Sequence, residues 1–172
     1  MFKLLGATLV IAASTLLGFQ IARNYQNRPL QLRLLQRGLK MLETEIVYGS
    51  VPLYQAMNKI GARLPGGVGL FFSSAGENLI TLDGASTFEC WRASIEQNFF
   101  QTALKKEDKD LLLQFGHTLG ITDKEDQMKH IQLTVEGLAT EEQIAREEQS
   151  KYEKLSKNLG VLLGILVVIL MY

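Results

Sequence analysis

The sequence predicts an all-α protein: a six-helix antiparallel bundle flanked by an N-terminal and a C-terminal transmembrane helix. Three observations predict this class. Both ends of the 172-residue chain are apolar, nearly all of the charge lies between Arg23 and Lys157, and the charged middle repeats apolar residues at helical spacing. We therefore expect an anchor over 1–23, a helical-bundle domain over 24–157 and a second membrane segment over 158–172.

The N-terminal apolar end is the longer one. The residues from Leu4 to Ala22 carry no formal charge, and as a helix they reach about 28 Å, close to the thickness of the hydrocarbon core. A cleaved signal peptide is the alternative, because Lys3 precedes the run and small residues abound in it. The run is long for a signal peptide, and Arg23 and Arg28 directly after it resist export of the downstream chain. These features favour a retained anchor.

The C-terminal apolar run, from Leu159 to Tyr172, is shorter and reaches only about 21 Å as a helix. Lysines one helical turn apart precede it and can extend its reach by snorkelling. Both runs thus carry basic flanks on the side of the middle region: Arg23, Arg28, Arg33, Arg37, Lys151, Lys154 and Lys157. This arrangement predicts a cytoplasmic bundle with both termini facing away. The same seven side chains are candidates for contact with membrane lipids.

Apolar stripes, prolines and glycines divide the middle region into six helical segments. They are expected over 30–48, 52–64, 68–79, 86–99 and 106–119, and from 122 into the C-terminal run. Pro29 is predicted to stop the chain before the first of them. Two capping boxes, Ser86–Glu89 and Thr122–Glu125, predict helix starts. The glycine-rich segment 65–69 predicts a turn between helices, because it lacks the Gly-Lys-Ser/Thr of a phosphate loop.

Few residues are suited to chemistry. Cys90 is the single cysteine, His117 and His130 are the only histidines, and no spacing is typical of a metal site. An aromatic stripe on the helix over 86–99 (Phe88, Trp91, Ile95, Phe99) is assigned to the core. The acidic residues over 107–110 alternate with lysines and predict a solvated helix start. We expect no enzyme, cofactor or metal; the alternative is a membrane-tethered enzyme that uses Cys90 with a histidine.

The net charge of the chain does not indicate a nucleic-acid partner. Eighteen Lys and Arg balance eighteen Asp and Glu, and the basic flanks lack interleaved aromatic residues. A membrane surface accounts for these flanks better than nucleic acid does. The oligomeric state stays open.

The segment 42–56, LETEIVYGSVPLYQA, is similar to the "GVPLxxAL" joint of type II secretion inner-membrane platform proteins (the F subunit). In this helix–turn–helix joint, Gly49 permits the chain reversal and Pro52 starts the second helix. Leu53 and Ala56 then pack that helix back on the first.

Over essentially its whole length the chain resembles the stage III sporulation protein AB family. The resemblance rests on the N-terminal anchor, on the segment 45–53 with its Tyr48-Gly49 and Pro52-Leu53, and on the pattern over 152–162 before the terminal anchor. It implies a six-helix bundle without catalytic residues, located in the mother-cell membrane around a forespore. It also implies partners in a secretion-like channel, namely a cytoplasmic hexameric ATPase and other membrane proteins.

Partner docking is expected at the end of the bundle farthest from the membrane. The turns at Gly66-Gly67 and Asp83-Gly84 are predicted as the lips of that end. The competing hypothesis is an exported, extracytoplasmic domain that bridges two membranes.

Overall fold

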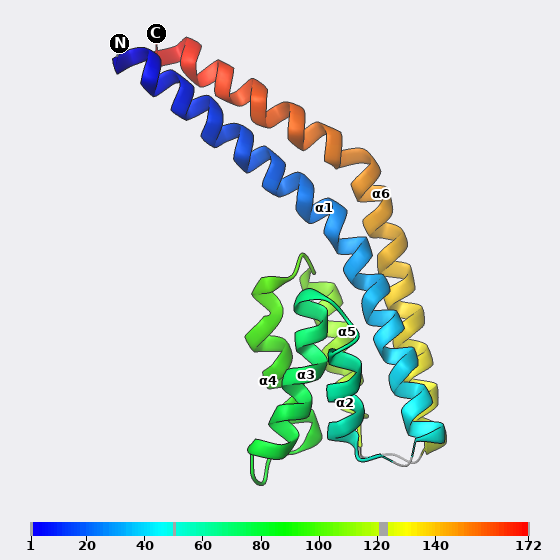
Figure 1. Ribbon diagram of the computed structural model, residues 1–172. Coiled ribbons are helices and arrows are strands. Elements are labelled where there is room, and N and C mark those ends of the chain that lie inside the picture. The colour runs from blue at the N-terminus through cyan, green and yellow to red at the C-terminus, as the bar shows by residue number, and fades with distance from the viewer. Residues whose placement is uncertain (1, 50, 121–123, 172) are drawn as a thin grey trace. The chain divides into compact units, whose positions relative to one another are not determined.

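Every regular element in the described part of the chain is a helix (Figure 1). The computed structural model describes residues 2–49, 51–120 and 124–171. The elements are α1 (Phe2–Tyr48), α2 (Leu53–Gly61), α3 (Gly66–Thr81), α4 (Thr87–Asn98), the 3-10 turn η1 (Phe99–Gln101), α5 (Lys106–Gly116) and α6 (Lys124–Met171). The all-α prediction is confirmed. The capping box expected over 122–125 lies partly outside the described residues.

The helices divide into two compact units. The first unit consists of Met1–Pro29 and Gln143–Tyr172, and the second of Leu30–Glu142. The first unit holds seven Lys and Arg against three Asp and Glu, whereas the second holds eleven against fifteen. The formal charges are therefore +4 and −4, which the neutral total of the chain conceals.

Pro29 lies inside α1 and is buried. The prediction that this proline stops the chain before a new helix at Leu30 is wrong. Proline lacks the N–H that would bond to the carbonyl oxygen of Tyr25, so it removes one helical hydrogen bond. One missing bond is tolerated here because packing holds residues on both sides of Pro29 in the helix. At the other end of the chain, the expected continuation of the last helix into the C-terminal run is confirmed by α6.

Close backbone approach defines the pairing of α2 with α3. A Cβ atom added to Gly61 would lie 2.6 Å from the backbone nitrogen of Ser73, and one added to Gly69 would lie 2.9 Å from the carbonyl oxygen of Gly61. Neither position has room for a side chain. The turn between the two helices contains Gly66 at φ +65°, a conformation that favours glycine. The predicted break between the two helices is confirmed. The expected turn over 65–69 is wrong for 66–69, because α3 begins at Gly66, and α3 is longer at both ends than the expected 68–79.

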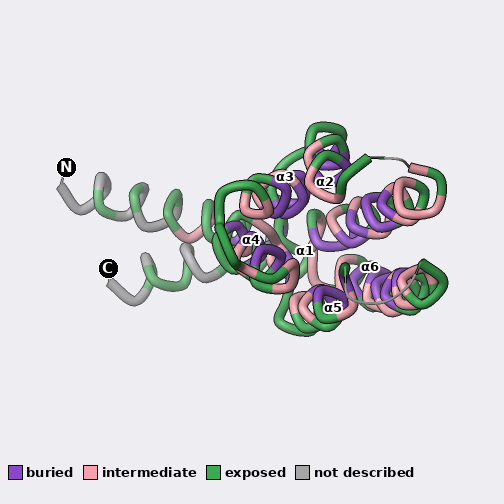
Figure 2. The backbone as a smooth tube through the Cα atoms, turned by 90° about the horizontal axis from the view of Figure 1, so that it is seen from below, coloured by how far each residue is buried: buried purple, intermediate pink, exposed green. Residues whose placement is uncertain are grey.

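The predicted apolar stripes form the core of the second unit, on the helix faces that turn toward one another (Figure 2). Its buried residues include Leu32, Leu35, Leu39, Leu42, Met57, Ile60, Leu64, Trp91, Ile95, Leu112, Phe115, Leu119, Ile131 and Leu138. The core assignment of the aromatic stripe is right for Trp91 and Ile95, and wrong for Phe88 and Phe99, which are only half-buried. Phe88 lies in the first turn of α4, and Phe99 follows α4 as the first residue of η1.

The antiparallel order of helices gives the second unit two ends (Figure 1). At one end the backbone N–H of Ala103 donates to the Gln31 side chain at 2.7 Å, and the Thr102 side chain adjoins Gly67. The α2–α3 and α4–α5 turns therefore lie where the chain enters the unit. The α3–α4 turn with Asp83-Gly84 lies at the other end. The prediction that Gly66-Gly67 and Asp83-Gly84 are the lips of one end is wrong, because the 16 residues of α3 lie between them.

The described parts of the helices contain no stretch that is both long enough and apolar enough to cross a membrane. The flanking transmembrane helices of the predicted fold are therefore not supported by the structure.

Candidate functional site

Polar contacts in the first unit join α1 to α6. The Arg28 guanidinium is 3.1 Å from a carboxylate oxygen of Glu148, and the Arg28 side chain is only 4% exposed. Gln26 donates to Glu153 at 2.6 Å, and the ring of Tyr25 stacks on that of Tyr152 with centroids 5.6 Å apart. A buried, paired guanidinium is engaged within the protein. Arg28 is thus a residue that holds the two helices together.

The other predicted lipid-contact residues differ in exposure. Arg23, Lys151 and Lys154 are exposed in the first unit, where the Lys151 ammonium lies 5.2 Å from the centroid of the Tyr152 ring. The Lys157 side chain lies outside the described residues. Arg33 and Arg37 belong to the second unit and are both exposed.

The predicted helix–turn–helix joint lies at the end of the second unit opposite to the chain entry. A Cβ atom on Gly49 would be 2.1 Å from the carbonyl oxygen of Glu45, so the position accepts only glycine. Pro52 precedes α2, and its carbonyl oxygen accepts from the N–H of Ala56 at 3.2 Å. Ala56 is buried and Leu53 half-buried. An ion pair from Lys59 of α2 to Glu45 of α1 closes the joint.

The same end carries an aromatic pair on its surface. The Phe88 ring stacks on the imidazole of His117 with centroids 3.8 Å apart, and the Arg92 guanidinium lies 5.6 Å from the Phe88 centroid. Cys90 is different, because it is 1% exposed and burial raises the pKa of its thiol. Both properties disfavour the thiolate that a nucleophile needs.

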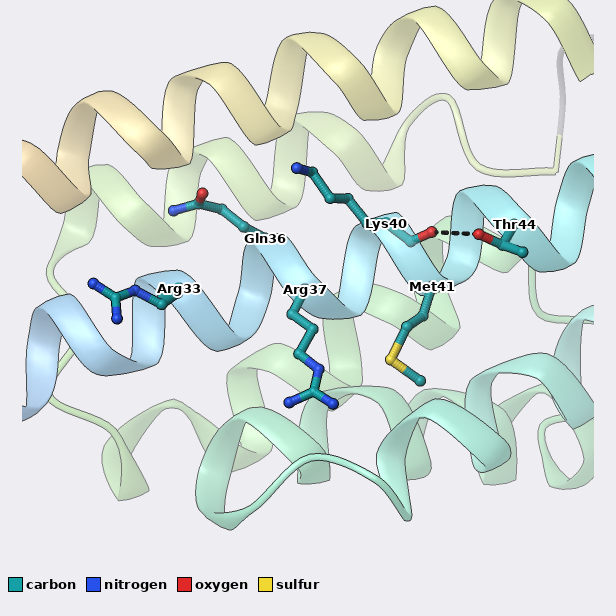
Figure 3. Close-up of a pocket in the computed structure, with 6 residues that line it drawn as sticks. All are labelled: Arg33, Gln36, Arg37, Lys40, Met41 and Thr44. Carbon is teal, nitrogen blue, oxygen red and sulfur yellow. Dashed lines mark hydrogen bonds between the residues drawn. The ribbon is translucent and has the colours of Figure 1, made fainter.

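An open groove of about 400 Å³ follows α1 in the second unit. Six residues of α1 line it, and we call it the α1 groove: Arg33, Gln36, Arg37, Lys40, Met41 and Thr44. In Figure 3 the side chains of Gln36 and Lys40 point toward α6, whereas those of Arg37 and Met41 point toward α2 and α3. The α1 groove therefore runs along α1 between its neighbours on either side.

Two residues that line the α1 groove, Arg33 and Gln36, already bind a carboxylate. Glu142 of α6 accepts hydrogen bonds from the Arg33 guanidinium at 3.0 and 3.1 Å and from the Gln36 amide at 2.8 Å. Glu142 is 9% exposed, whereas the Arg33 side chain is 57% exposed, so water still reaches the guanidinium side of the pair. Arg33 and Gln36 thus show that this surface of α1 can bind an acidic side chain that a neighbouring helix presents.

Among the described residues there is no cluster of three or more His, Cys, Asp or Glu that could hold a metal ion. The acidic run over 107–110 is only partly a solvated helix start, because Asp108 is fully buried and accepts from the backbone N–H of Lys105 at 2.7 Å. Asp108 therefore caps α5 from inside the second unit. Its position three residues after Lys105 was the signal for this role that the sequence offered.

Three comparisons with known proteins agree with one another. Residues 3–172 match the family described as "Stage III sporulation protein AB (spore_III_AB)". The stage III sporulation protein AB of Bacillus subtilis (strain 168) is 40% identical over 172 residues, which cover 99% of each chain. A solved structure of stage III sporulation protein AB (SpoIIIAB) is similar with a TM-score of 0.69 at 36% identity, and the match covers 73% of this chain and 98% of the solved one.

Proposed function

The chain belongs to the stage III sporulation protein AB family, and we propose that it serves sporulation as a non-enzymatic membrane platform of a secretion-like channel between mother cell and forespore. The observation that carries this proposal is the similarity over the full length, at 40% identity, to a protein named for its part in sporulation. Because that similarity includes both apolar ends, the likeness is not limited to the bundle.

Exposed apolar surface in the first unit supports a place in the membrane. Among the described side chains, Leu16 is 69% exposed, Leu162 60% and Ile169 68%. Apolar residues exposed along both helices of one unit are typical of a surface that lipid or another protein covers. The proposed platform spans the membrane through 1–23 and 158–172.

The distribution of charge supports a cytoplasmic bundle. The first unit carries +4 and the second −4, and the exposed Arg23, Lys151 and Lys154 flank the apolar ends on the side of the bundle. Positive charge beside a membrane segment stays on the cytoplasmic side. These three residues, rather than the buried Arg28, are the proposed contacts with anionic lipid headgroups in the mother-cell membrane.

The proposed partners are a cytoplasmic secretion-type ATPase and the other membrane proteins of the channel. The end of the bundle with the Gly49–Ala56 joint and the Asp83-Gly84 turn is the proposed docking end, because it lies opposite to the entry of the chain at Leu30. The test is co-purification of the full-length chain with the channel ATPase from intact membranes. Recovery of the ATPase is expected, and repeated failure under conditions that retain the membrane components contradicts the role.

Topology is tested separately with a reporter fused after Lys40. A cytoplasmic reporter signal is expected, and an extracytoplasmic signal supports instead an exported domain that bridges two membranes. The membrane-tethered enzyme is tested with Cys90→Ser. We expect unchanged sporulation, because Cys90 is buried and its thiol is disfavoured as a nucleophile.

A further inference from the structure

The α1 groove places positive charge on a negatively charged unit. The second unit has a formal charge of −4, yet its stretch from Leu30 to Met41 contains three cations and no acidic residue. All three cations, Arg33, Arg37 and Lys40, line the α1 groove. A local reversal of sign of this kind attracts an anionic partner to one place on the surface.

The three cations differ in what they contact. Arg33 is bound to Glu142, which also accepts from Gln36. Arg37 and Lys40, one and two helical turns farther along, are exposed and form no ion pair with any residue whose side chain is described. The next acidic residue on α1, Glu43, accepts from Gln132 of α6 at 3.2 Å. Arg37 extends toward α2 and α3 and Lys40 toward α6 (Figure 3), and neither is paired with a described carboxylate.

The size and lining of the α1 groove indicate the kind of anion. From Arg33 to Thr44 the groove follows α1 for about 16 Å, or three helical turns. Met41 adds an apolar, adaptable surface beside the cations. A small free anion would use neither the length nor the methionine. A short acidic segment of a protein chain uses both, and the Glu142 contacts show how a helix presents a carboxylate to this surface.

We propose that the α1 groove binds an acidic segment of a partner protein, in which two carboxylates one helical turn apart pair with Arg37 and Lys40. Met41 contacts an apolar side chain of the same segment. This site lies along α1 on the side of the bundle, and its last lining residue, Thr44, lies near the start of the joint segment 42–56. It deepens the proposed docking role and rests on that role for its biological partner, but its binding chemistry can be tested without the channel.

The test measures binding of a fluorescein-labelled, alanine-based helical peptide of about 12 residues, long enough to cover the groove, with glutamates one turn apart and one leucine between them. The full-length chain in detergent is titrated at physiological ionic strength, and fluorescence anisotropy is read. The same peptide with glutamine in place of glutamate is the ligand control. The site variant is R37E/K40E, and the matched control is R63E/K129E, which reverses two other exposed cations of the second unit.

We expect the wild-type chain and R63E/K129E to bind the glutamate peptide with equal affinity, and R37E/K40E to bind it about tenfold or more weakly. A peptide with lysine in place of glutamate should bind R37E/K40E better than it binds the wild type. Equal losses in both variants, or no wild-type preference for glutamate over glutamine, overturn the proposal. Intact folding of each variant is checked by the fluorescence of Trp91, the single tryptophan.

Two further measurements distinguish the proposed acidic segment from other possible occupants of the α1 groove. If R37E/K40E binds the peptide normally but loses flotation with phosphatidylglycerol vesicles, the α1 groove binds lipid and the proposal is wrong. If R37E/K40E instead dissociates an oligomer seen by light scattering, a second copy of this chain occupies the groove and the proposal is likewise wrong. Failure of the ATPase to co-purify while the peptide still binds counts against the proposed function alone.

Discussion

The indole N–H of Trp91 donates a hydrogen bond to the backbone carbonyl oxygen of Leu112 at 2.7 Å, inside the core of the second unit. Trp91 belongs to α4 and Leu112 to α5, so this bond links two helices through residues that are 21 positions apart along the chain. The Trp91 ring also meets Phe72 and Phe115 edge-on, with centroids 5.5 and 5.8 Å away. One side chain thus connects α3, α4 and α5.

Trp91→Ala is expected to lower the free energy of unfolding by about 3–5 kcal/mol, because it leaves a large cavity and removes the hydrogen bond. Trp91→Phe should cost less, about 1–3 kcal/mol, because most of the ring is kept. Urea unfolding followed by circular dichroism measures both. The control is Phe100→Ala, at a position that is 80% exposed, which should change stability little. An equal effect at both positions contradicts the assigned core.

Gly69→Ala is expected to destabilise the second unit by about 1–3 kcal/mol, because the added methyl group meets backbone atoms that cannot move independently. The new Cβ would lie 2.1 Å from the carbonyl oxygen of Leu64. Gly137→Ala is the matched control: its Cβ would lie 3.1 Å from the end of the Leu111 side chain, which can shift. Thermal unfolding compares the two. A larger loss at Gly137 contradicts the close pairing of α2 with α3.

Glu89→Gln is expected to destabilise α4 at neutral pH and to have less effect in acid. The N–H of Ser86 donates to the Glu89 carboxylate at 2.8 Å, and chiefly this bond lowers the pKa of Glu89 below its usual value. A carboxyl with a lowered folded-state pKa contributes stability above its unfolded-state pKa, near 4.5, and loses that contribution as pH falls through the folded-state value.

The measurement is the difference in unfolding midpoint between wild type and Glu89→Gln, at neutral pH and in acid well below the ordinary pKa of a glutamate. We expect the difference to shrink in acid. Glu96→Gln, on the exposed surface of the same helix, is the control and should show no comparable change at either pH. A difference for Glu89→Gln that stays constant across the range means that the carboxylate is not the stabilising species.

Arg28→Ala is expected to weaken the pairing of α1 with α6 in the first unit by about 1–3 kcal/mol, because it leaves Glu148 without its buried cation. In a double-mutant cycle with Glu148→Ala the two losses should not add. The exposed Arg23→Ala should leave stability unchanged and reduce binding to anionic vesicles. Equal vesicle binding losses for both arginines would show that Arg28 contacts lipid in spite of its burial.

Sequence alone determined the features that depend on neighbouring residues. The Ser86–Glu89 capping box and the break between helices beside Pro65-Gly66 were predicted correctly, because a cap and a tight turn depend on a few adjacent residues. Helical periodicity likewise identified the buried faces of α1, α2 and α5. The requirement for glycine at position 49 came from the same local reasoning.

Tertiary structure decided the features that depend on contacts between distant segments. Pro29 breaks helices in isolation, but it lies within α1 because packing on both sides outweighs one missing hydrogen bond. Asp108 looks like a solvated acid in the sequence, yet the fold buries it as a cap.

Likewise, Arg28, Arg33 and Arg37 form one basic flank in the sequence, and only their distant partners separate them. Glu148 engages Arg28 in one unit, Glu142 engages Arg33 in the other, and Arg37 stays exposed in the α1 groove. Sequence periodicity gives the face on which a charge lies. The partner across the interface comes from another part of the chain, and that partner decides whether the charge holds helices together or binds a ligand.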